Sequence, residues 1–121
     1  IVGGCPHIDD DEHLATDVAI ELAGEAGRPL DLHTDEQLDV DVLGLRYLAR
    51  RVRETGLSTG VTASHCVSLG MQTPDIQQAV AEEAAERAGA AHRVPLVAQP
   101  PGEQRHGVVR VTRLGHRTPG R

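Results

Sequence analysis

The sequence predicts an α/β protein in which four parallel strands alternate with three helices and an irregular tail follows. Three observations lead to this prediction. Short apolar runs alternate with longer segments of helical apolar periodicity, the connections between runs are long enough for crossovers, and Gly or Pro residues separate the segments. Such a sheet is either open and doubly wound or part of an eight-stranded barrel. In both, functional side chains gather at the carboxyl ends of the strands.

The first strand is expected over residues 1–4 and is ended by Cys5-Pro6-His7. The acidic stretch Asp9-Asp10-Asp11-Glu12 then suits the start of a helix, because carboxylates cap exposed N–H groups and complement the helix dipole. This helix is expected to stop near Gly27. Its expected buried face consists of apolar residues at helical spacing: Leu14, Val18, Leu22 and Ala26, with Ala15, Ala19 and Ala23 beside them.

The remaining elements follow the same alternation. A strand begins at Leu30, and a helix is expected over 39–55, with Val42, Leu45, Leu48, Ala49 and Val52 on its apolar face and Gly56 at its end. A third strand covers 60–65, a loop covers 67–72, and Thr73-Pro74 starts a helix that runs to about Ala88, with Ile76 and Val80 on its apolar side. The last strand is expected over 94–98. Residues 1–99 are thus one unit, and residues 100–121 form an irregular basic tail.

Composition and charge exclude several classes of function. Residues 1–100 contain seven Arg and seventeen acidic residues, whereas residues 101–121 contain five Arg and one Glu. The acidic body argues against a nucleic-acid-binding surface. No apolar run approaches the ~20 residues of a membrane span, and two cysteines are too few for a secreted disulfide framework. A cytoplasmic location is the default expectation, although the chain lacks an initiator Met and any targeting segment could be missing.

Polar side chains of the kind that bind metals or move protons follow each expected strand. They are Cys5 and His7; His33, Asp35 and Glu36; His65 and Cys66; and Gln99. Imidazole and carboxylate are the usual ligands of Zn and Fe(II), and a catalytic metal activates water near neutral pH. A carboxylate that is not a ligand can then carry the proton to the leaving group. Any single histidine at a strand end is, however, more often a hydrogen-bonded or solvent-facing side chain than a ligand.

These residue types suggest distinct roles. His33 is the expected metal ligand, Glu36 the proton shuttle, and His65 a side chain that holds the attacking water. Asp35 is expected to orient its neighbours or to cap a loop. His7 and Cys66, like Asp35, are further candidates for supporting the site or contacting substrate. Cys66 and Cys5 are more often small buried residues than ligands.

Three segments, in their order and intervals, resemble the middle of a cytosine-deaminase-like member of the amidohydrolase superfamily. They are VGGCPH at 2–7, LDLHTDE at 30–36 and VTASHC at 61–66, and the resemblance covers about residues 1–88. It implies strands four to seven of a metal-bearing TIM-type (β/α) barrel. His33 matches the metal-ligating histidine of strand five, Glu36 the acid that relays protons to the ring, and His65 the strand-six histidine that contacts the metal-bound hydroxide. The implied reaction is hydrolytic deamination of an amino-substituted nitrogen heterocycle with Zn or Fe(II).

The departures from this pattern lead to further expectations. The His-x-His pair of strand one and the aspartate of strand eight have no counterpart here, so the chain is expected to be an inactive fragment of a larger enzyme. The tail at 100–121 has no family-like pattern, which suggests a frameshifted or prematurely ended reading frame. Two alternatives stay open: an amidohydrolase that cleaves another C–N bond, such as an alkylamino group on a triazine-like ring, and a non-catalytic half-barrel. The expected partner is a small heterocycle, with no nucleic acid and no membrane; a homo-oligomeric parent is left open.

Overall fold

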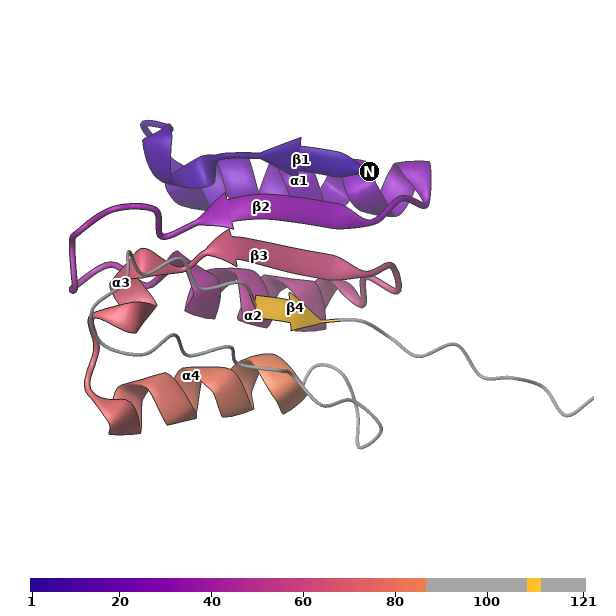
Figure 1. Ribbon diagram of the computed structural model, residues 1–121. Helices are drawn as coiled ribbons and strands as arrows, with labels where there is room; N and C mark the ends of the chain where they lie inside the picture. Colours follow the sequence, from indigo (N-terminus) through magenta and orange to yellow (C-terminus); the bar gives the residue numbers. More distant parts are fainter. Residues whose placement is uncertain (87–108, 112–121) are drawn as a thin grey trace, which may run out of the picture.

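The computed structural model describes residues 1–86 and 109–111 (Figure 1). Strands and helices alternate along the first of these segments. The elements are β1 (Val2–Gly4), the 3-10 helix η1 (Pro6–Ile8), α1 (Glu12–Ala26), β2 (Leu30–Thr34), α2 (Gly44–Thr55), β3 (Val61–His65), α3 (Val67–Gly70), α4 (Pro74–Glu86) and β4 (Val109–Val111). The alternation predicted from the sequence is therefore confirmed for its first three strands and three main helices.

The strands form one sheet in the order β1-β2-β3-β4. β1, β2 and β3 run parallel, with Leu30 opposite Val2 on one side and opposite Val61 on the other. The prediction of parallel strands is therefore confirmed for these three, and the predicted fourth, at 94–98, lies outside the described residues. β4, a different segment, runs antiparallel to β3. An antiparallel edge strand needs no crossover helix, which is why the alternating pattern gives no sign of it. The described strands form an open sheet, and a closed barrel is not seen in them.

One face of the sheet is packed against the helices, and this packing decides which side chains reach the site. α1 and α2 lie behind the sheet in Figure 1, and α4 packs against α2. Leu30, Leu32 and Thr34 of β2 are buried, whereas Asp31 is half-buried and His33 is exposed. Because side chains alternate along a strand, the first three face the helices and the other two face away from them. His33, the expected metal ligand, is thus on the face opposite the hydrophobic core.

Helix α1 buries a different face from the predicted one. Its buried residues are Thr16, Ala19, Ile20 and Ala23. Leu14, Val18 and Leu22 are 60%, 45% and 50% exposed, and together with β1 and Pro6 they line a cavity of about 560 Å³. The helix carries two apolar stripes, and periodicity cannot say which of them the sheet covers. The prediction of Ala19 and Ala23 as core residues is confirmed. That of the exposed residues Leu14, Val18, Leu22 and Ala26 is wrong.

The predicted C-terminal ends of the helices agree with the structure better than the predicted N-terminal starts do. Gly27 and Gly56 have φ values of 58° and 67° and end α1 and α2, as predicted. The carboxylate of Asp11 accepts a hydrogen bond from the N–H of Leu14 at 2.9 Å, so the acidic stretch does cap α1. α2 begins at Gly44, five residues later than predicted, because its first N–H groups are bound by a side chain distant in the sequence, described below.

Two further predictions concern the segments after β3. Val67–Gly70, predicted as loop, forms the short helix α3, and Val109–Val111 forms β4 within the tail that was predicted to be irregular. The predicted strand at 94–98 and the last two residues of the predicted third helix lie outside the described residues. The apolar side of α4 is as predicted, with Val80 buried and Ile76 packed against the core.

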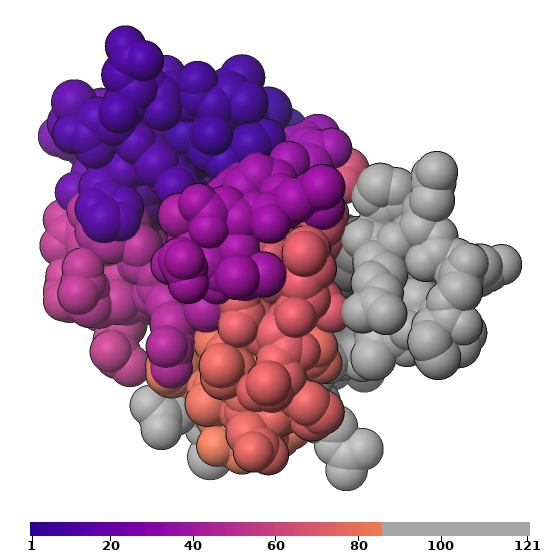
Figure 2. All heavy atoms as spheres, turned by 90° about the vertical axis from the view of Figure 1, so that its left-hand side faces the viewer, coloured from indigo at the N-terminus to yellow at the C-terminus, as the bar shows by residue number. Residues whose placement is uncertain are grey.

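The carboxyl ends of β1, β2 and β3 meet at one end of the molecule, which faces the viewer in Figure 2. There the N-terminal segment, the loop after β2 and the segment around α3 lie side by side. Ser68 ties the last two together, because its N–H donates to the carbonyl oxygen of Asp35 and its hydroxyl donates to that of Gln37. Across the described part of the chain, every helix is too short or too polar to span a bilayer.

Candidate functional site

Strand pairing brings the two predicted histidines together. In the parallel pair formed by β2 and β3, His33 lies opposite Ser64 and Thr34 lies opposite His65. The two imidazole rings are neighbours, with centroids 4.5 Å apart and planes tilted by 45°. Residues separated by about thirty positions in the chain thus meet at the carboxyl end of the sheet, where a parallel α/β fold places its functional groups.

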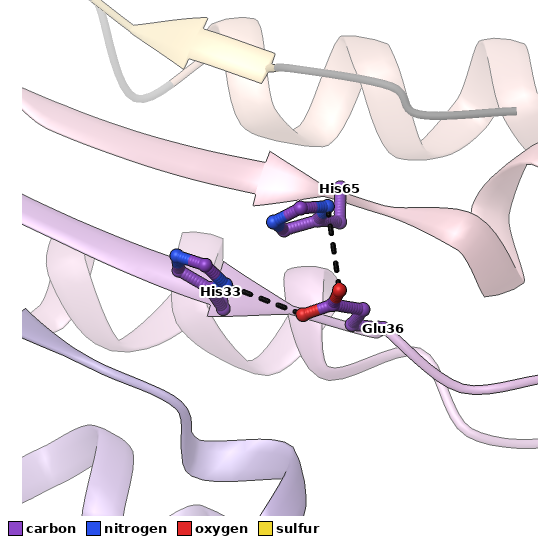
Figure 3. A group of neighbouring side chains, drawn as sticks. All are labelled: His33, Glu36 and His65. Carbon is purple, nitrogen blue, oxygen red and sulfur yellow. Dashed lines mark hydrogen bonds and ion pairs between the residues drawn. The ribbon is translucent and has the colours of Figure 1, made fainter.

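Glu36 joins the two rings from the loop that follows β2 (Figure 3). Its Oε2 lies 3.2 Å from Nδ1 of His33, and its Oε1 lies 3.6 Å from Nδ1 of His65. The hydrogen bond with His33 lowers the pKa of Glu36 below its ordinary value, and the charge of His65 acts in the same direction. Glu36 is therefore a carboxylate at neutral pH, held between two imidazoles by one oxygen each.

Asp35 lies beside this group but points the other way. It is fully buried, and its Oδ1 and Oδ2 accept hydrogen bonds from the N–H groups of Gly44 at 2.6 Å and Leu45 at 3.0 Å. Burial raises the pKa of Asp35, and these two hydrogen bonds oppose the rise. Asp35 thus caps the first turn of α2, which corresponds to the capping alternative for this residue. The cap ties the end of β2, and with it Glu36, to the helix.

Residues in unusual backbone conformations gather at the same end of the sheet. Asp35, His65 and Cys66 have φ values of 54°, 73° and 46°, and they are the non-glycine residues with positive φ among those described. This conformation costs about 1–2 kcal/mol for an ordinary residue, and such strain is found preferentially at functional sites. The sharp turn after β3 directs the imidazole of His65 toward Glu36 rather than into the core.

The remaining predicted residues take supporting positions. His7 is nearly buried, with Nδ1 at 3.0 Å from the carbonyl oxygen of His33 and Nε2 at 4.0 Å from Oε2 of Glu36. Cys66 is buried, and its thiol lies 3.8 Å from the carbonyl oxygen of Ala63. Cys5 is half-buried in the wall of the cavity beside α1, and Gln99 lies outside the described residues. Neither cysteine belongs to the His33, Glu36 and His65 group.

Sequence reasoning missed the carboxylate pair behind the site. A Cβ atom at Gly44 would collide with the carboxylate of Glu12 and would lie 2.9 Å from Oδ1 of Asp35, so a side chain there would displace Glu12 and crowd the cap formed by Asp35. Burial, and next the charge of Asp35, raise the pKa of Glu12. Sequence reasoning also missed Asp31, whose Oδ1 accepts a hydrogen bond from the hydroxyl of Ser64. Asp31 could have been found from alternation, since it lies two residues before His33 and so on the same face of β2.

Comparisons with known proteins identify relatives of this chain. No family model matches it. A pterin deaminase of Rhizobium rhizogenes is 35% identical over 79 residues, which are 65% of this chain and 18% of the relative. The crystal structure of 5-methylcytosine deaminase from Klebsiella pneumoniae, liganded with 5-fluorocytosine, matches with a TM-score of 0.63 and 27% identity over 70% of this chain and 21% of that chain. The chain is homologous to part of amidohydrolase-superfamily deaminases. The resemblance noted from the sequence is therefore confirmed, and the chain spans about a fifth of each of these deaminases.

The donor set of this deaminase-like segment fits a divalent metal. His33, Glu36 and His65 each offer a ligand atom, and these atoms all lie within 4.8 Å of one another. Since a carboxylate only accepts hydrogen bonds, the Nδ1 atom of His33 that faces Glu36 carries a proton, and Nε2 of a neutral ring then keeps its lone pair. In Figure 3 this Nε2 points away from Glu36. Histidines that bind metals commonly donate their other ring N–H to a carboxylate in this way.

Proposed function

We propose that this chain is part of a metal-dependent hydrolytic deaminase that acts on an amino-substituted nitrogen heterocycle. The observation that carries the proposal is the convergence of His33, Glu36 and His65 on a segment homologous to deaminases. One relative is a pterin deaminase, and the structure of the other holds 5-fluorocytosine. Pterin and cytosine both carry an amino group on a carbon bonded to ring nitrogen, so hydrolysis at such a carbon is the shared chemistry.

In this proposal His33 holds the metal through Nε2, and Glu36 keeps the ring of His33 in the required tautomer. A divalent metal, Zn or Fe(II), supplies Lewis acidity that makes water nucleophilic near neutral pH. Glu36 takes up the proton of the attacking water and returns it to the ring nitrogen or the departing amine. Glu36 is ionised at neutral pH and so can accept this proton, and its lowered pKa favours rapid return of the proton to the ring or the amine.

His65 completes the proposed arrangement without exchanging the proton itself. His65 approaches the second carboxylate oxygen of Glu36 and orients the attacking water. The two oxygens of Glu36 are thereby kept apart, one toward each ring, so that the carboxylate cannot turn away from the water. Ammonia is the leaving group, and the ring carbon that carried it becomes a carbonyl.

A chimera tests this proposal. The segment of the Rhizobium rhizogenes pterin deaminase that matches this chain is replaced by the corresponding residues of this chain, and ammonia release from pterin and from cytosine is measured. Deamination by the chimera is expected, together with a loss of about 10²–10⁴-fold in kcat on Glu36→Gln. Asp39→Asn, an exposed acid in the same loop, serves as the matched control. A folded chimera whose Glu36→Gln variant keeps its kcat would contradict the role of Glu36.

The isolated chain is expected to release no ammonia from either substrate with Zn or Fe(II) added, since His33 supplies a single ligand of the proposed site. Robust turnover by the purified chain would show that the described group is sufficient. The same substrate panel includes alkylamino-substituted triazines, because the attack on the ring carbon is identical when the leaving group is an alkylamine. Turnover of triazines without turnover of pterin or cytosine would favour that alternative. A cytoplasmic location stays a prediction.

A further inference from the structure

His7 is the least exposed of the four side chains at this end of the sheet. Its side chain is 8% exposed, compared with 47% for His33, 37% for Glu36 and 25% for His65. It comes from η1, the segment directly after β1, so a third strand end contributes to the group. Two of its contacts involve proposed site residues: Nδ1 lies 3.0 Å from the carbonyl oxygen of His33, and Nε2 lies 4.0 Å from Oε2 of Glu36.

The contact with His33 takes the place of a missing bond between strands. Carbonyl oxygens along β2 alternate between its two neighbours. That of Thr34 accepts from the N–H of Cys66 on the β3 side, whereas that of Pro29, just before β2, accepts from the N–H of Val2 on the β1 side. The carbonyl of His33 therefore faces β1. β1 pairs with β2 only as far as Gly4 opposite Leu32, and Nδ1 of His7 supplies the donor beyond that point.

We propose that His7 is a positioning residue for His33 and Glu36. By bonding the carbonyl of His33 it holds the last residues of β2 in strand geometry, and this directs the His33 ring toward Glu36. Its Nε2 edge also stands beside Oε2 of Glu36 and limits rotation of the carboxylate, so that Oε2 stays with His33 and Oε1 with His65. The importance of this role rests on the proposed function, because it matters only if His33 and Glu36 form the site.

The test uses the whole chain and three variants. His7→Phe keeps a ring but removes both nitrogens, and His7→Asn keeps a donor that can reach the carbonyl of His33. His13→Phe is the matched control, because His13 stacks on Tyr47 with ring centroids 3.8 Å apart, outside the His33, Glu36 and His65 group. Long-range ¹H–¹⁵N correlation spectra at pH 8 report which nitrogen of the His33 ring carries the proton. Zn²⁺ affinity is measured on the chimera with the Rhizobium rhizogenes pterin deaminase, carrying the same variants, because the isolated chain supplies a single ligand of the proposed site.

The expected spectrum of the unchanged chain shows His33 protonated at Nδ1. This signature should be retained in His7→Asn and His13→Phe and replaced by a mixture of tautomers in His7→Phe. Zn²⁺ affinity should fall about 10–100-fold in His7→Phe, the usual loss when a residue supporting a metal ligand is removed. It should change less than about 3-fold in the other two variants.

Each other outcome decides the question. An unchanged His33 signature and Zn²⁺ affinity in folded His7→Phe would overturn the positioning role. Loss of the signature in His7→Asn would also overturn it, and this variant decides the matter if His7→Phe does not fold. If the chimera binds no Zn²⁺ but the tautomer in the chain follows His7 as expected, positioning stands and the metal part of the proposed function loses its support. Failure of either proposal can thus be told from failure of the other.

Discussion

Replacement of Asp35 tests how the fold holds the candidate site. Its buried carboxylate accepts the N–H groups of Gly44 and Leu45, and its backbone has a φ of 54°. We expect Asp35→Ala to lower the free energy of unfolding by more than any exposed substitution in this loop. Asp35→Asn should cost much less, because asparagine tolerates a left-handed backbone and its amide oxygen can still accept one of the two N–H groups.

The expected loss of unfolding free energy in Asp35→Ala has two contributions. Loss of a side-chain cap at a helix N-terminus costs about 0.5–2 kcal/mol. Alanine in a left-handed backbone conformation costs about 1–2 kcal/mol more. Asp35→Ala should therefore destabilise the chain by about 1.5–4 kcal/mol. Asp35→Asn should cost about 1 kcal/mol, the amount of a single lost hydrogen bond.

Urea unfolding followed by far-UV circular dichroism measures these differences. The matched control is Asp39→Ala, because Asp39 is an exposed acid in the same loop whose carboxylate accepts only the nearby N–H of Asp41 among the hydrogen bonds described for it. The control should change the free energy of unfolding by less than about 0.5 kcal/mol. If Asp35→Ala costs no more than the control, or if Asp35→Asn costs as much as Asp35→Ala, the capping argument is refuted.

The raised pKa of Asp35 also predicts how the free energy of unfolding depends on pH. Burial raises the pKa of Asp35 above its ordinary value of 3.8, so the folded chain binds more protons than the unfolded chain just above that pH. Stability from this group is therefore fully present below pH 3.8 and is lost as the pH rises through the folded-state pKa. The advantage of the unchanged chain over Asp35→Asn should shrink as the pH rises above 3.8 through the folded-state pKa. The pKa of Glu12 is also raised by burial, so Glu12 likewise makes the free energy of unfolding fall as the pH rises. This contribution has the same sign in the unchanged chain and in Asp35→Asn.

Further substitutions test the packing, the strained turn and the charge of the site. Ile20→Ala should cost about 2–4 kcal/mol and Leu22→Ala less than about 1 kcal/mol, because Ile20 is 3% exposed and Leu22 is 50% exposed; equal losses in urea unfolding would contradict the described face of α1. His65→Gly should be less destabilising than His33→Gly by about 1–2 kcal/mol, since only His65 has a positive φ, and the reverse order would argue against strain. The carboxyl ¹³C resonance of Glu36 should titrate below pH 4.5 in the unchanged chain and closer to 4.5 in His33→Gly, because the hydrogen bond from His33 is the largest cause of its lowered pKa; an unchanged midpoint would exclude that cause.

Local features of the chain were predictable because their causes lie within a few residues. Gly27 and Gly56 end helices because glycine adopts a positive φ without a clash, and Leu30 and Leu32 identify a strand because apolar residues two apart share one face. Asp11 caps α1 across only three residues. The candidate residues were also visible, since a parallel α/β pattern places chemistry at the strand ends. The positions of those strand ends relative to one another could not be predicted from the sequence.

The tertiary structure decided everything that depends on contacts between distant residues. The start of α2 was missed because Asp35 binds Gly44 across nine positions, and the buried face of α1 was missed because both stripes of the helix are apolar. Strand pairing brings His65 to the end of β2, and its positive φ accompanies the turn of its ring toward Glu36. The 3-10 helix η1 gives His7 its contact with the carbonyl of His33. Side-chain periodicity records which residues avoid water. It carries no information on which other element covers them, because that is set by the summed packing of the whole domain.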